Sequence, residues 1–398
     1  AEHEAWARQH LADYAPRPDE IAFKAAAAAA TAAAATPSAT AGDDPADARR
    51  RFLRALRLNP SARLTLFLQL RPGEAQGARP SLPWQEVTTL PSGIGARQAR
   101  YVALAEGDEA TALDVLATAS HEPDYGLDLG LFTDSGTEHG ARYGFGKMPF
   151  GNPKLEYATQ APFHMGLYHE SRLVFMAASF LRRTQPEARI ALFTALARHA
   201  LANGHDYWGW RFAGWAMHYV QDLTQPYHAQ ILPGVSTPRM LGVNAVAMAG
   251  WKRPMAHAIT LVSNRHGVVE GWQWQRMVRA YESGRTDDPL FMALRDLRRD
   301  RAHWRYGPTS TREVVSRESA DASAALDTQL ERSFPAYYTD DPLVELGTRT
   351  DGVDWIGLAL KHSQTEAAAL ERHVAGLLQR LGVHSRALVR EVLNKEKP

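Results

Sequence analysis

Cysteine does not occur among the 398 residues of this chain. A disulfide framework and a thiolate metal site are therefore both excluded. Any bound metal ion would depend on histidine, aspartate, glutamate or backbone groups. Sixteen histidines give the chain an ample supply of nitrogen ligands, so a metal site without sulfur is the first kind of site to look for.

Net charge and long apolar runs are also scarce. The 45 Lys and Arg residues nearly balance the 44 Asp and Glu residues, which argues against a polyanionic partner recognised by bulk charge but leaves a buried phosphate site open. No apolar run reaches the roughly 20 residues that a membrane-spanning helix needs. The opening stretch AEHEAWARQH lacks the basic and apolar segments of an export signal. It predicts either a cytosolic protein or an exported protein whose signal has been removed.

Helical periodicity dominates the chain from residue 155 onward. Apolar residues recur there at i, i+3, i+4 and i+7, and few segments alternate with a period of two. We therefore predict a mainly α fold. In its second half, helices are expected at residues 256–280, 313–331, 354–382 and 386–394.

The segment HYVQDLTQPYHAQ, residues 218–230, places two histidines and an aspartate around a Gln-Pro break. His218 and Asp222 are four residues apart, so on a helix their side chains leave one face one turn apart. Pro226 cannot continue that helix. The chain must turn at this point, which can bring His228 back beside the same face.

A second His–carboxylate pair follows in NRHGVVEGW, where His266 and Glu270 are again four residues apart on a predicted helix. Imidazole nitrogen and carboxylate oxygen at this spacing suit Zn²⁺. One such pair is common by chance in a chain with 16 histidines. Two pairs, with a third histidine on the turn after the first, are typical of a metal site.

The segment MHYVQDLTQPYHA resembles the signature of the zinc-dependent phospholipase C and P1/S1 nuclease superfamily. That signature is His-Tyr-x₂-Asp-x₂-Gln-Pro-x-His, followed downstream by His-x₃-Glu or His-x₃-Asp. The resemblance is strongest over residues 210–272 and implies a multi-helix domain with a cluster of up to three zinc ions. Glu270 is similar to the phospholipase C branch, since the nucleases more often carry aspartate at that position.

The resemblance also extends upstream, to a loop-like stretch rich in Gly, Asp, Glu and His. The segment EPDYG supplies Asp124, which matches an aspartate beside the metal ions that is thought to serve as general base. A metal-binding histidine follows that aspartate in the family. His139 is our preferred candidate because it follows Asp124 by 15 residues. His164 is the alternative, because it stands nearer the usual distance from the main motif.

The N-terminus departs from the family pattern. Members begin with a tryptophan whose amine and carbonyl bind one zinc ion, and a nearby histidine completes that site. Here the first tryptophan, Trp6, is internal. We take His10 as the candidate ligand of this ion and His3 as the alternative, with the amine of Ala1 as a further donor.

Three regions follow from composition and resemblance together. They are an N-terminal helix with an Ala-rich and Pro/Gly-rich insertion (1–107), a zinc-dependent catalytic core (108–285), and a C-terminal helical extension (286–398). The last is expected either to pack on the core or to form an appendage.

The resemblance implies a phosphodiester hydrolase with two zinc ions, and with a third if the N-terminal residues provide its ligands. One ion would be bound by His139, His218 and Asp222, and another by His228, His266 and Glu270. Asp124 would orient or deprotonate a water molecule. The favoured activity is that of a phospholipase C on phosphatidylcholine-like lipids, with transient membrane-surface contact and a secreted or periplasmic location.

Two alternatives stay open. A P1/S1-type single-strand nuclease or 3′-nucleotidase would use the same metal chemistry. A helical zinc-binding protein without turnover would bind the metal and cleave nothing.

Overall fold

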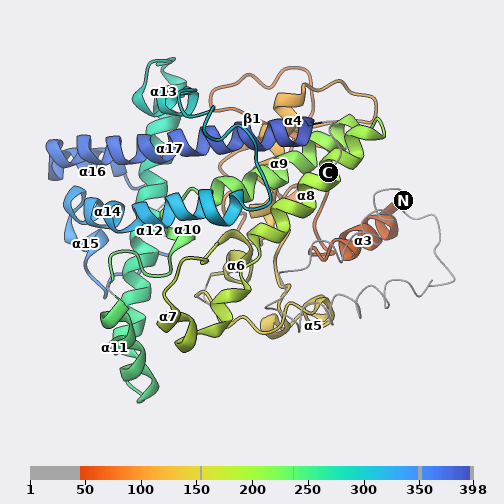
Figure 1. Ribbon diagram of the computed structural model, residues 1–398. Helices are drawn as coiled ribbons and strands as arrows, with labels where there is room; N and C mark the ends of the chain where they lie inside the picture. Colours follow the sequence, from red (N-terminus) through yellow and green to blue (C-terminus); the bar gives the residue numbers. More distant parts are fainter. Residues whose placement is uncertain (1–44, 153–154, 236, 348–351, 395–398) are drawn as a thin grey trace. The chain divides into compact units, whose positions relative to one another are not determined.

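The computed structural model describes residues 45–152, 155–235, 237–347 and 352–394 (Figure 1). In these ranges α-helices predominate and strand is confined to one small sheet, so the prediction of a mainly α fold is confirmed. None of the helices described there is long and apolar enough to cross a membrane. The candidate ligands His3 and His10 lie outside the described residues.

The chain forms two compact units, each assembled from segments that are distant in sequence. The first comprises Ala1–His164, Arg183–Val220 and Leu388–Pro398, and the second comprises Met165–Arg182 and Gln221–Ala387. The region boundaries predicted at residues 107 and 285 come from composition and family resemblance, not from contacts within the fold, and they stay predictions.

The first unit contains the sheet and the helices that accompany it. Its elements are α3 (Pro45–Ala55), β1 (Phe67–Leu70), β2 (Ser81–Leu82), η2 (Trp84–Glu86), β3 (Arg100–Ala103), α4 (Ala112–Ala119), η3 (Glu122–Tyr125), η4 (Thr133–Ser135), α5 (Glu138–Tyr143), η5 (Ala158–Gln160), α6 (Ala161–His164), α8 (Pro186–Ala202) and α9 (Asp206–Asp222). Strand β3 lies between β1 and β2 and is antiparallel to both. The sequence did not predict these strands, because segments of two to four residues are too short to show a period of two.

The sheet supports the short helix η3. Tyr125 of η3 packs against Phe67 and Tyr101 in a buried cluster. Its hydroxyl donates to Gln69 Oε1 at 2.7 Å and lies 2.9 Å from the Tyr101 hydroxyl. The region predicted as an insertion therefore supplies part of the core that positions Asp124, the neighbour of Tyr125.

The second unit is built from helices around one apolar core. Its elements are α7 (Arg172–Ala177), η6 (Ser179–Arg183), α10 (Pro226–Ala229), α11 (Thr237–Met248), α12 (Arg253–Glu282), α13 (Pro289–Arg295), the π-helix η7 (Ser310–Ser316), α14 (Arg317–Ser333), α15 (Ala336–Thr339), α16 (Trp355–His362) and α17 (Gln364–Leu393). Val268 and Trp272 of α12 share this core with Leu330 of α14 and Leu370 of α17. Much of the C-terminal third is therefore packed on the helices that carry His228 and His266.

One predicted helix break is wrong. We expected an interruption between residues 382 and 386, but α17 runs from Gln364 to Leu393 and the break falls earlier, at Ser363. Gly382 lies inside α17, at a position where a Cβ would lie 2.3 Å from the carbonyl oxygen of Leu294. The glycine permits a close approach of two backbones and does not end the helix.

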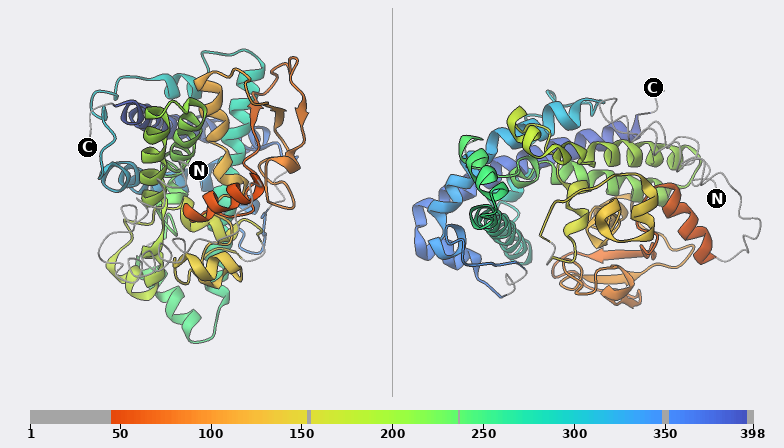
Figure 2. Two further views of the ribbon diagram at one scale, coloured as in Figure 1. Left: turned by 90° about the vertical axis from the view of Figure 1, so that its right-hand side faces the viewer. Right: turned by 90° about the horizontal axis from the view of Figure 1, so that it is seen from below.

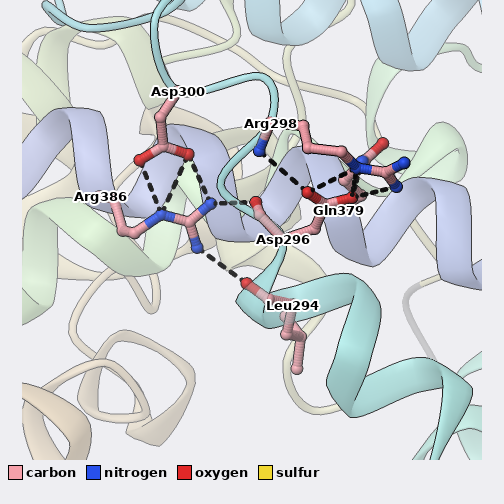
Figure 3. A network of polar contacts seen from close by, with 6 residues as sticks. All are labelled: Leu294, Asp296, Arg298, Asp300, Gln379 and Arg386. Carbon is pink, nitrogen blue, oxygen red and sulfur yellow. Dashed lines mark hydrogen bonds and ion pairs between the residues drawn. The ribbon is translucent and has the colours of Figure 1, made fainter.

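Arg386, one turn after Gly382, holds α17 against the segment that follows α13 (Figure 3). Its guanidinium donates to the carbonyl oxygens of Leu294 at 2.8 Å and Asp296 at 2.7 Å. Nη2 also donates to the Asp300 carboxylate at 2.7 Å. Because these groups lie on a segment distant in sequence, the network fixes the register of α17.

Candidate metal centre

Three potential ligands converge in the first unit. Asp124 of η3, His164 of α6 and His218 of α9 each offer one ligand atom, and these atoms all lie within 4.8 Å of one another. Nε2 of His218 is 2.9 Å from Nδ1 of His164, and Oδ1 of Asp124 is 3.6 Å from each of the two nitrogens. We call these residues the first donor group.

The orientation of His218 is fixed by a backbone contact. Its Nδ1 lies 2.7 Å from the carbonyl oxygen of Ser120. A carbonyl can only accept, so Nδ1 carries the proton and, in the neutral ring, Nε2 presents a lone pair towards His164. This arrangement is the usual second contact of a metal-binding histidine.

A buried ion pair links the two elements that hold Asp124 and His218. Arg211 donates to both oxygens of Glu122, at 2.8 Å and 2.6 Å, and both side chains are buried. Glu122 lies two residues before Asp124, and Arg211 lies two helical turns before His218. The bidentate geometry therefore fixes η3 against α9 close to the first donor group.

A second buried carboxylate holds the C-terminal end of α9. Tyr219, next to His218, donates its hydroxyl to Asp128 Oδ2 at 2.5 Å. Arg189 donates its Nε to the other oxygen of Asp128 at 2.9 Å. Asp128 is fully buried, so these two donors compensate for the loss of its hydration.

The structure places His164, and not His139, beside His218. Nε2 of His139 lies 3.3 Å from the carbonyl oxygen of Leu129, and its ring packs against Tyr143. His164 reaches the donor group because its neighbour Phe163 is fully buried and anchors α6 in the core. His139 is therefore not among the residues of the first donor group, whereas the alternative, His164, is.

Asp124 lies close to the two histidines and is also partly exposed to solvent. Its side chain is 56 % exposed, whereas those of His164 and His218 are nearly buried. One oxygen faces the two imidazoles, so it can act as a metal ligand. The exposed part of the carboxylate faces solvent, where it can bind a water molecule, as its predicted role as general base requires.

His121 is a neighbour of this group that sequence reasoning missed. Crowding by protein atoms lowers the pKa of His121, the proximity of His218 lowers it further, and Asp124 opposes both effects. The signal was available in the segment SHEPDYG, where His121 stands one helical turn before Asp124.

A second donor group lies in the second unit and consists of His228, His266 and Glu270. Nε2 of His228 is 3.2 Å from Nε2 of His266, and Nε2 of His266 is 2.8 Å from Oε1 of Glu270. The chain turns where Pro226 predicted, since α9 ends at Asp222 and α10 begins at Pro226. The structure thus brings together these three residues as the sequence predicted.

Aromatic stacking and a buried charge network hold His266 in place. The ring of Tyr227 stacks on His266 with centroids 5.6 Å apart and an interplanar angle of 16°. The Tyr227 hydroxyl donates to Asp327 Oδ1 at 2.6 Å, and Arg265 donates to Asp327 Oδ2 at 2.5 Å. Asp327 of α14 thus holds both Tyr227, which stacks on His266, and Arg265, which precedes His266 on α12.

Asp222 contacts a member of the second donor group. Its Oδ1 lies 3.3 Å from Nδ1 of His228. The predicted sharing of a metal ion with His139 and His218 stays a prediction. The turn at Pro226 brings His228 back to this carboxylate. A carboxylate behind an imidazole is a common second contact in metal sites.

Charge coupling within the second group shifts two pKa values in opposite directions. Burial alone would lower the pKa of His266, but the Glu270 carboxylate raises it above its usual value. The side chain of Glu270 is 52 % exposed. The protein atoms around its carboxylate would by themselves raise its pKa, but His266 lowers it. Each residue therefore stabilises the charged form of the other, and a divalent cation between them would take over the role of the imidazolium proton.

The spacing of the donor atoms suits a divalent metal ion such as zinc. In a tetrahedral zinc site with nitrogen ligands at about 2.0–2.1 Å, two such nitrogens lie roughly 3.3 Å apart. The imidazole nitrogens of the two groups are 2.9 Å and 3.2 Å apart. Two histidines and one carboxylate, with an exposed side, are typical of hydrolytic zinc sites, which keep one position for water.

Comparisons of the chain with protein-family models, curated protein sequences and solved structures each give no match.

Proposed function

We propose that the chain is a zinc-dependent phosphodiester hydrolase of the phospholipase C type. In this proposal Asp124, His164 and His218 hold one zinc ion. His228, His266 and Glu270 hold another. The observation that carries the proposal is that the motif residues of two distant helices, α10 and α12, meet with their imidazole nitrogens 3.2 Å apart.

The chemistry follows from the donor sets. Bound zinc would lower the pKa of a water molecule towards 7 and offset negative charge on phosphate oxygens. Asp124, the exposed member of the first donor group, orients that water or accepts its proton. The contacts of His218 with Ser120 and of His228 with Asp222 keep the two imidazoles in a fixed orientation, so they do not need to reorganise during the reaction.

A phospholipid is the favoured substrate. Glu270 is similar to the phospholipase C branch of the superfamily, and the near balance of charged residues suits a zwitterionic headgroup better than a polynucleotide. The resemblance to that superfamily and the geometry of the two groups are independent supports, since one comes from sequence and the other from side-chain positions.

The test combines metal analysis with activity. Elemental mass spectrometry on the purified chain is expected to find at least two zinc ions per molecule. The chain is expected to release phosphocholine from phosphatidylcholine, and a chelator should abolish the release until zinc is restored. Cleavage of single-stranded DNA without lipid cleavage would favour the nuclease, and zinc without either activity would favour the non-catalytic protein.

Asp124→Asn tests the assignment within the site. We expect this variant to lose turnover by at least about 100-fold, because a general base typically contributes 10²–10⁴-fold. Retention of both zinc ions with lost turnover would show that the role as base is the essential one, because the amide oxygen of Asn can still bind the ion. Loss of one zinc ion would show that the role as ligand is the essential one. Full activity with full zinc content would remove Asp124 from the mechanism.

A further inference from the structure

Helices α11 and α12 form a hairpin in the second unit whose end carries an exposed tryptophan. We call residues 237–262 the basic hairpin. Trp251, in the turn between the two helices, is 76 % exposed. In Figures 1 and 2 the end of this hairpin extends beyond the other helices of the second unit. So large an apolar side chain at a projecting end is a candidate contact residue if further apolar side chains are exposed beside it.

Further apolar side chains are exposed on the hairpin and on the helix that contacts it. Ile259 of α12 is half exposed, and α7, which contacts α11, exposes Leu173 and Met176, the latter by 72 %. All of these residues belong to the second unit. The hairpin and the helix that contacts it therefore both expose large apolar side chains.

The segments that contain the hairpin and α7 carry basic residues and almost no acidic ones. No Asp or Glu occurs among residues 223–269. Arg239, Lys252 and Arg253 are exposed on the hairpin, and Arg172 and Arg182 are exposed on or beside α7. The one acidic residue of the segment 165–182, Glu170, accepts a hydrogen bond from the backbone of Ile231 at 2.7 Å.

The exposed tryptophan and the neighbouring basic residues together indicate which kind of partner would bind the hairpin. An exposed indole next to two basic residues matches the polar–apolar boundary of a lipid bilayer, where Trp, Lys and Arg are favoured. A groove for a protein partner would bury its aromatic anchor in a preformed pocket, whereas Trp251 projects from a turn. We infer that the basic hairpin is a docking surface for anionic lipid membranes, with Trp251 inserted at headgroup depth and the basic residues bound to lipid phosphates.

This inference goes beyond hydrolysis, because it concerns where the chain binds and not what it cleaves. It holds whether or not the donor groups bind zinc. Membrane binding without lipid cleavage would leave the inference standing and refute the proposed activity, so the two can fail separately.

Co-sedimentation with vesicles tests the docking. The full chain is expected to bind vesicles that contain phosphatidylglycerol more tightly than vesicles of phosphatidylcholine alone, and high salt should weaken the binding. Trp251→Ala should weaken binding about tenfold, as expected for one large apolar side chain. Lys252→Gln with Arg253→Gln should weaken it about 30-fold, since each basic residue near an anionic surface contributes roughly one factor of five.

The absence of cysteine permits a direct reading of depth. Trp251→Cys, labelled with an environment-sensitive fluorophore, should show a blue shift and quenching by brominated lipid on anionic vesicles. Leu343→Cys is the matched control, because Leu343 is 82 % exposed in the same unit but follows Asp340 and Asp341 closely. It should show neither effect.

Three outcomes would overturn the inference. These are equal responses at both labelled positions, binding that does not depend on Trp251 or on the two basic residues, and concentration-dependent self-association that Trp251→Ala abolishes. The last result would make the hairpin a contact between two copies of the chain. Melting curves of all variants must match that of the parent chain, so that lost binding is not confused with unfolding.

Discussion

The carboxylate of Asp222 lies 3.3 Å from Nδ1 of His228, while Nε2 of the same ring lies 3.2 Å from His266. The imidazole of His228 thus connects a carboxylate on one side with the second donor group on the other. Both Asp222 and His228 are largely buried, so the contact is poorly screened by solvent.

Asp222→Asn should therefore weaken the binding of zinc by the second donor group about 10–100-fold, the usual effect of losing such a contact. Competition with a chelating dye measures the affinity. Asp206→Asn, at the exposed start of α9, is the control and should change nothing. Loss of a whole zinc ion at saturating metal would instead make Asp222 a direct ligand, as the family resemblance implies.

The positions of His164 and His139 lead to a comparison of two variants. His164→Asn removes a nitrogen that lies 2.9 Å from His218 and should lower the zinc content by one ion per chain. His139→Asn removes a ring that contacts the Leu129 carbonyl and should leave the zinc content unchanged. Elemental analysis of the two purified variants decides the matter, and the reverse result would restore His139 as the ligand.

The second donor group could be predicted from the sequence because its information is local. Helical spacing links His266 to Glu270, and Pro226 dictates the turn that returns His228 to the end of α9. The first donor group is different. The choice between His139 and His164 depends on which loop packs into the core, and the burial of Phe163 beside His164 is a tertiary property that spacing does not contain.

The fold shows the same limit. Helices such as α12 and α14 are long enough to show apolar residues at helical spacing, and they were predicted closely. The strands that support Tyr125 are too short to show an alternation of apolar and polar residues. The helix end predicted at residue 382 falls on a glycine, and a glycine that serves a close approach has the same sequence signal as a glycine that ends a helix.

Glu318 of α14 gives the second unit a pH-dependent contribution to stability. Burial alone would raise the pKa of Glu318, but the hydrogen bond and charge of His384 and the charges of Arg299 and Arg380 lower it to about 2. Nε2 of His384 is 3.0 Å away and Nη2 of Arg299 is 2.9 Å away. A carboxylate whose pKa is depressed on folding stabilises the native state above its unfolded pKa, and this stabilisation is lost as the pH falls through the folded value.

Glu318→Gln should accordingly lower the free energy of unfolding by about 2 kcal/mol at pH 6. The difference in the free energy of unfolding between the parent chain and the variant should narrow as the pH falls from about 4.5 towards 2. The reason is that the parent chain loses the contribution of Glu318 in this range, whereas the variant never has it. Urea unfolding at a series of pH values measures the gap. The exposed Glu313→Gln is the control. A gap that stays constant over this range would contradict the assignment.

Substitutions at Gly382 and Gly376 of α17 can be compared to test how closely that helix packs against α13. A Cβ at Gly382 would lie 2.3 Å from the carbonyl oxygen of Leu294 and 2.9 Å from Nη1 of Arg386, which donates to that same oxygen. A Cβ at Gly376 would meet no atom within 4 Å. We expect Gly382→Ala to destabilise the chain by about 2 kcal/mol through overpacking. Gly376→Ala should stabilise it by up to about 1 kcal/mol through helix propensity. Urea unfolding followed by far-UV circular dichroism gives both values. Equal effects of the two substitutions would mean that α17 does not approach α13 as closely as the Leu294 contact requires.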